Sequence, residues 1–131
     1  MLCLLARLLA LAVLAVPPVL AQGNPPELTP ETRAAQNLAI ATAVQDQLLA
    51  CWILPPGYEN RSISVRLAFL GDGTLDGDPY IVPESLRTAG KYPELIGSIA
   101  AAIDACLPFE GLEALGAAAG ERFDITVHFS S

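Results

Sequence analysis

The chain has 131 residues and a formal net charge of −7, from seven basic and fourteen acidic residues. This excess of acid argues against nucleic acid as a partner, since binding phosphates requires clustered lysine and arginine. The single histidine leaves no second one for a metal site or a proton relay, so we expect no cofactor, no metal site and no enzymatic activity.

Residues 1–21 have the features of a signal peptide. Arg7 is their one charge, a long apolar run follows it, and two prolines precede the small residue Ala21. We expect cleavage after Ala21. The alternative is an uncleaved anchor, because Leu2 to Leu20 is nineteen residues long and about twenty residues can span a bilayer. Membrane contact is expected in that alternative alone.

Cleavage would change the composition of the chain. Without Cys3 and Arg7 the remainder has two cysteines and six basic residues against fourteen acidic ones, a formal charge of −8. The remaining stretch, about 110 residues long, is the size of one small domain. Residues 22–30 contain three prolines and predict a short extended tether, so we expect the domain itself to span residues 31–131.

A helix is predicted from about Glu31 to Trp52. Thr29 is a candidate N-cap with Pro30 at the first helical position, and Pro55 and Pro56 end the element. Apolar residues recur at helical spacing and predict the buried stripe, which comprises Leu38, Ala41, Val44, Leu48 and Cys51 with Trp52.

A hairpin is predicted next. Residues 62–69 alternate strictly, with apolar side chains at the odd positions and smaller or polar ones at the even positions, which is typical of a strand with one buried face. Residues 71–74 form an Asp-Gly turn. Residues 75–82 return as a weaker strand, since Gly77 and Pro79 interrupt it.

A second helix is predicted at 92–106, with an apolar stripe and Pro108 as its stop. Residues 111–120 predict a short helical turn between glycines, and residues 123–129 alternate as a third strand. The expected fold is therefore α+β with two layers, in which helices pack on one face of a three-stranded antiparallel sheet. The shared core is expected to include Trp52, Phe69, Ile99, Ile103 and Phe109.

The strand at 63–70 should lie in the middle of the sheet, which leaves the last strand with an open edge. An open edge offers unpaired backbone groups to which a partner's strand can add, unless charges or the turn at 111–120 shield it. The candidate binding residues are Phe123, Asp124, Ile125, Thr126, Val127, His128 and Phe129.

Cys51 and Cys106 each end a predicted helix just before a proline turn. In an exported chain two such cysteines are natural disulfide partners. Asp72, Asp76 and Asp78 could offer oxygens to calcium, but they lack the spaced ligands and distal glutamate of an EF-hand, and a hairpin turn explains them better.

The ordered set of these features resembles the C-terminal periplasmic domain of TolA, which is related in fold to that of TonB. It comprises Cys51-Trp52 followed by prolines, the strand running into Asp72-Gly73-Thr74-Leu75 and Asp78-Pro79, the helix ending in Cys106-Leu107-Pro108-Phe109, and the strand from Phe123 to Phe129. The resemblance covers about Thr32 to Phe129, but the long helical spacer of TolA is missing.

The resemblance implies a periplasmic interaction module of the Gram-negative envelope, part of the Tol-Pal system, with partners of the TolB or Pal type bound by strand addition. If residues 1–21 are not cleaved, the module would be anchored in the inner membrane and face the periplasm. The alternative function is a secreted small domain that binds a ligand or inhibits an enzyme.

Overall fold

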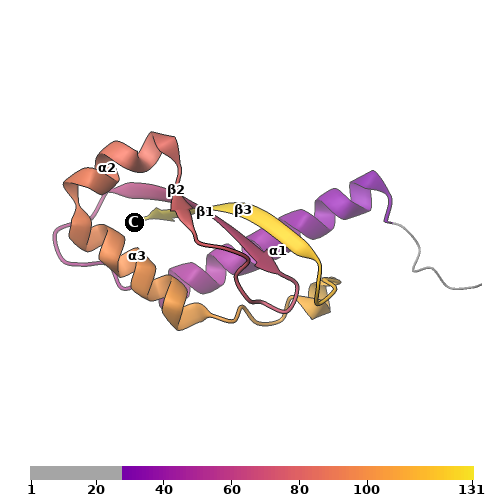
Figure 1. The fold of residues 1–131 in the computed structure, drawn as a ribbon. Helices are drawn as coiled ribbons and strands as arrows, with labels where there is room; N and C mark the ends of the chain where they lie inside the picture. The colour runs from indigo at the N-terminus through magenta and orange to yellow at the C-terminus, as the bar shows by residue number, and fades with distance from the viewer. Residues whose placement is uncertain (1–27) are drawn as a thin grey trace, which may run out of the picture.

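The computed structural model of the chain describes residues 28–131, so the expected signal peptide and most of the expected tether lie outside it. Helices pack against a three-stranded antiparallel sheet, which confirms the predicted α+β class (Figure 1). The elements in chain order are α1 (Pro30–Cys51), β1 (Ser62–Leu70), β2 (Tyr80–Ile81), the 3-10 turn η1 (Pro83–Ser85), α2 (Leu86–Lys91), α3 (Pro93–Cys106), the 3-10 turn η2 (Glu113–Leu115) and β3 (Arg122–Ser130).

The sheet has the order β2-β1-β3, with β1 in the middle as predicted. β1 and β3 pair along their whole lengths, from Ser62 opposite Ser130 to Leu70 opposite Arg122. The expected return strand at 75–82 is much shorter. It consists of the two residues of β2 and an isolated bridge between Phe69 and Leu75, because Gly77 turns the chain with a φ of 92° and proline at position 79 has no N–H to donate.

Helix α1 begins as the sequence predicts. The hydroxyl of Thr29 accepts a hydrogen bond from the N–H of Thr32 at 3.2 Å, and Pro30 occupies the first turn. The predicted stripe is wrong at its start, because Leu38 is 69% exposed and Ile40 is buried in its place. The first turns of α1 extend past the sheet (Figure 1), so burial begins only where the helix meets the strands.

The core lies between the inner face of the sheet and helices α1 and α3. The core contains four of the residues predicted for it, namely Phe69, Ile99, Ile103 and Phe109. The prediction was wrong for Trp52, which is half-buried. Trp52 follows the end of α1, so its ring covers the margin of the core. The ring meets Phe129 edge to face at 5.5 Å, and its Nε1 donates to the Ser98 hydroxyl at 2.9 Å.

Residues 83–91 form η1 and α2, which the sequence did not predict. Their apolar residues are too few for a helical stripe, and Leu86 is 56% exposed. The hydroxyl of the buried Ser85 accepts the N–H of Ser64 at 2.9 Å, at the point where the β1–β2 ladder ends. The turn at η1 therefore satisfies a β1 amide that no strand reaches.

The predicted disulfide between Cys51 and Cys106 is present and joins the ends of α1 and α3, with a Cα–Cα distance of 6.0 Å. It is consistent with an extracytoplasmic location. Among residues 28–131, no helix is both long enough and apolar enough to cross a membrane.

Candidate functional site

Strand β3 pairs with β1 on one side, and within residues 28–131 no strand lies on its other side. In an antiparallel pair, successive residues direct their backbone groups alternately toward the partner strand and away from it. On the opposite side of β1, the N–H of Val82 donates to the carbonyl of Ser64 at 3.1 Å. The backbone groups of Ser64 are therefore directed toward β2 and away from β3. His128 lies opposite Ser64, so its own backbone groups point away from β1, to the free edge of β3. By the same alternation, the backbone groups of Thr126 and Asp124 also point to the free edge.

One end of this edge is covered. The side chain of Gln45 on α1 accepts the N–H of His128 at 3.4 Å. The N–H groups of Asp124 and Thr126 have no hydrogen-bond partner in the part of the chain that the structure describes. The open stretch is therefore shorter than the predicted 123–129.

The turn at residues 111–120 does not shield the edge by hydrogen bonding to it. Its 3-10 segment η2 is held by α1 instead, where the side chain of Gln36 donates to the carbonyl of Leu115 at 3.3 Å. The carboxylate of Asp124 pairs with the Arg66 guanidinium at 2.7 Å on the outer face of the sheet. This pair places charge above the strand and leaves the backbone N–H of Asp124 unbonded.

The two faces of β3 differ in polarity. Phe123, Val127 and Phe129 are buried, and Ile125 on the same face is half-buried. Thr126 and its neighbours of even number lie on the polar outer face. A strand added at this edge would therefore meet an incompletely covered apolar side chain below the sheet and a hydroxyl above it.

His128 is exposed on the outer face of the sheet, and its pairing with Ser64 across the strands was not predicted from the sequence. The Nδ1 of His128 lies 2.6 Å from the Ser64 hydroxyl. A serine–histidine pair can support nucleophilic catalysis when a third group orients the imidazole. The Nε2 of His128 has no hydrogen-bond partner among the described residues, so the geometry here is that of a cross-strand hydrogen bond.

Two of the three aspartates of the hairpin have partners elsewhere than at a shared site. Asp72 Oδ1 accepts both the hydroxyl (2.6 Å) and the N–H (3.0 Å) of Thr74, and these bonds lower the pKa of the Asp72 carboxyl. Asp76 pairs with Arg122 at 2.7 Å. Within residues 28–131, no three histidine, cysteine or acidic side chains gather closely enough to hold a metal ion.

Gln47 makes a contact that sequence reasoning missed, because the helical pattern places it on the wet side of α1. Its amide donates to the Glu110 carbonyl at 2.8 Å and accepts the Glu110 N–H at 3.0 Å. The two bonds lie close to the disulfide and hold the segment after α3 against α1. No signal in the local sequence points to this pairing, because the two residues are far apart in the chain.

Residues 34–131 match the family described as uncharacterised conserved protein UCP034077. The chain belongs to this family. Comparison with curated proteins found no match, and comparison with solved structures found none either.

Proposed function

We propose that this chain is an extracytoplasmic protein–protein interaction module that binds its partner by strand addition at the free edge of β3. The observation that carries the proposal is the pair of backbone N–H groups at Asp124 and Thr126, which have no partner within residues 28–131. An extended segment placed there would gain main-chain hydrogen bonds, and its side chains would give selectivity on the two faces.

The resemblance to the TolA C-terminal domain supports a periplasmic module of the Tol-Pal type, with partners of the TolB or Pal type. The disulfide supports an oxidising compartment of that kind. Whether the module is free or anchored in the inner membrane depends on residues 1–21, which lie outside the described residues.

The described side chains support binding over catalysis. Both cysteines within residues 28–131 are in the disulfide, and His128 bonds a serine on an open sheet face. Asp72 is occupied by the turn that it stabilises. These groups have structural partners, whereas the backbone of Asp124 and Thr126 is left available.

A proline at position 126 tests the proposal. Proline removes the outward N–H and leaves the β1–β3 ladder intact, because Thr126 does not donate to β1. We expect Thr126→Pro to weaken binding of a TolB-derived or Pal-derived extended peptide by about tenfold or more, as the loss of one hydrogen bond and the clash of the ring with an added strand imply. The measurement is a calorimetric titration of the disulfide-bonded protein.

Thr126→Val is the matched control, since it changes the side chain and keeps the backbone N–H. It should bind nearly as well as the original chain. Undiminished affinity of a folded Thr126→Pro variant would move the site away from this edge. If that variant melts early, peptide-induced shifts in the NMR spectrum of the unmodified protein decide the matter, and they should centre on Asp124 and Thr126.

A further inference from the structure

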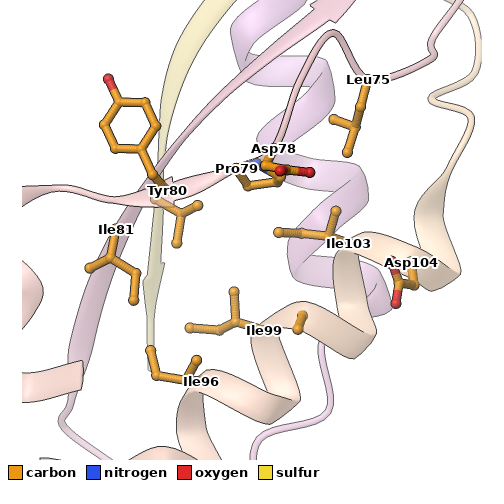
Figure 2. Close-up of a pocket in the computed structure, with 11 residues that line it drawn as sticks. Leu75, Asp78, Pro79, Tyr80, Ile81, Ile96, Ile99, Ile103 and Asp104 are labelled. Atoms are coloured by element: carbon orange, nitrogen blue, oxygen red, sulfur yellow. The ribbon is translucent and has the colours of Figure 1, made fainter. Parts of the chain in front are cut away.

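A pocket of about 420 Å³ lies at the edge of the sheet opposite β3, between the β2 segment and helix α3 (Figure 2). Three isoleucines of α3 point into it from one side, and Leu75 and Ile81 enter from the other, while the ring of Tyr80 points away. The lining is therefore mostly apolar, and its volume falls in the lower part of the range for ligand sites, about 300–1,000 Å³. The isoleucines are Ile96, Ile99 and Ile103.

The pocket exists because of the irregular return strand. Between Leu75 and Tyr80, the chain supplies two aspartates, a glycine and a proline, and none of these carries a large apolar side chain that could cover α3. Gly77 has a φ of 92°, and proline at position 79 cannot extend the ladder. Ile96 of α3 is thus left half-buried beside this space, whereas Ile99 and Ile103 are almost fully covered by the rest of the core.

The backbone beside the pocket can pair with a peptide. Val82 donates its N–H to β1, so the adjacent Ile81 directs its N–H and carbonyl away from β1. The side chain of Ile81 enters the pocket (Figure 2). A peptide could thus bond to the backbone of Ile81 while one of its side chains fills the space beside Ile99.

The charge at the pocket is acidic. Asp78 and Asp104 both line it, and in Figure 2 their carboxylates lie on the same side of the view as Ile103. The nearby Asp76 is paired with Arg122, but neither Asp78 nor Asp104 forms an ion pair with any described residue. An apolar cavity with two unneutralised carboxylates complements a group that is apolar and cationic together.

We propose that this pocket binds a polypeptide segment of a partner in which a leucine-sized or phenylalanine-sized side chain lies beside lysine or arginine. The large side chain fills the apolar space, the basic group meets Asp78 and Asp104, and the main chain pairs with Ile81. The site goes beyond the proposed function, because β2 and β3 form opposite edges of the sheet. Either edge could bind without the other.

The test uses a short blocked peptide with a central leucine between two lysines and a glycine at each end. Added to the disulfide-bonded, isotope-labelled protein, it should shift the amide signals of Ile81, Ile99 and Ile103 in a saturable manner. The same peptide with alanine at its centre, or with glutamates in place of the lysines, should bind at least about fivefold more weakly.

Two variants on α3 form a matched pair. Ala100 is exposed and lines the pocket, whereas Ala101 is exposed and does not line it. Ala100→Phe should fill the space and abolish the peptide-induced shifts, while Ala101→Phe should leave them unchanged. The double variant Asp78→Asn with Asp104→Asn should weaken binding about fivefold, as expected for two exposed ion pairs.

Several results would overturn the proposal. If the glutamate peptide binds as tightly as the lysine peptide, Asp78 and Asp104 do not select a cationic group. If the leucine peptide causes no saturable shifts, the pocket does not bind this kind of segment. If octylamine competes with the peptide at equal affinity, the occupant is a small cationic amphiphile and not a polypeptide. The Thr126→Pro variant distinguishes this pocket from the β3 edge. The leucine peptide should bind that variant as tightly as it binds the unmodified protein, because the substitution lies at the opposite edge of the sheet.

Discussion

Gly73 shows how a single residue fixes the hairpin against the end of the core. Its φ is 89°, its N–H donates to the Leu70 carbonyl at 2.8 Å, and its carbonyl accepts the N–H of Phe109 at 2.9 Å. A Cβ at this position would collide with the backbone of Phe109. Glycine is therefore required at this position for two reasons: the backbone is left-handed, and the two chain segments approach too closely for a side chain.

We predict that Gly73→Ala lowers the free energy of unfolding by about 3 kcal/mol, from conformational strain and a backbone clash together. Gly77→Ala is the control. Gly77 has a φ of 92° with no atom near the Cβ position, so its substitution should cost about 1 kcal/mol. Urea unfolding of both variants gives the comparison, and equal losses would show that the approach to Phe109 adds nothing.

At the scale of the secondary-structure elements, hydrophobic periodicity predicted the two long helices and the two long strands. The alternation at 62–70 was sufficient to place Phe69 and its odd-numbered neighbours in the core. The same method missed α2, because residues 83–91 have no apolar stripe and are held by tertiary contacts such as the hydroxyl of Ser85. It also misplaced the start of the α1 stripe, since periodicity cannot show where a helix leaves the sheet.

Phe69 ties the sheet to the segments on either side of it. It is fully buried, meets Phe109 edge to face at 5.5 Å and stacks on Phe123 at 5.6 Å. We predict that Phe69→Ala lowers the free energy of unfolding by about 3 to 5 kcal/mol through the cavity that it leaves. Tyr80→Ala, at a position 56% exposed, should cost less than about 1 kcal/mol. An unchanged melting temperature for Phe69→Ala would contradict the assigned core.

For the whole molecule, the disulfide closes a long loop between the ends of α1 and α3, with 55 residues of sequence separation. In the chain-entropy view, a cross-link of this length contributes up to about 4 kcal/mol, mainly by restricting the unfolded chain. We predict that the double variant Cys51→Ser with Cys106→Ser folds to the same structure with its free energy of unfolding lowered by up to that amount.

Denaturant titration and circular dichroism check this prediction, and the Gln47–Glu110 bonds should still hold the two segments together. Mass spectrometry of a non-reduced digest provides the companion measurement. Two free thiols in protein purified from an oxidising compartment would contradict the bond.

The candidate site was predicted from the sequence in outline. The order of the elements placed β3 at an edge, and its alternation predicted which side chains are inward. The extent of the free edge could not be predicted from the pattern of β3, because it depends on Gln45. This residue of α1 is far from β3 in the sequence, yet its side chain accepts the N–H of His128. The pocket beside α3 was not predicted either, since it results from what the Leu75–Tyr80 segment fails to cover.

Amide hydrogen exchange at Thr126 is the most direct test of strand addition at β3. In the free protein the Thr126 N–H has no partner among the described residues and should exchange quickly, whereas the Val127 N–H faces β1 and should exchange slowly. With saturating TolB-derived or Pal-derived peptide, we predict that Thr126 becomes protected while Val127 changes little. A bound state in which Thr126 still exchanges as fast as in the free protein would contradict it.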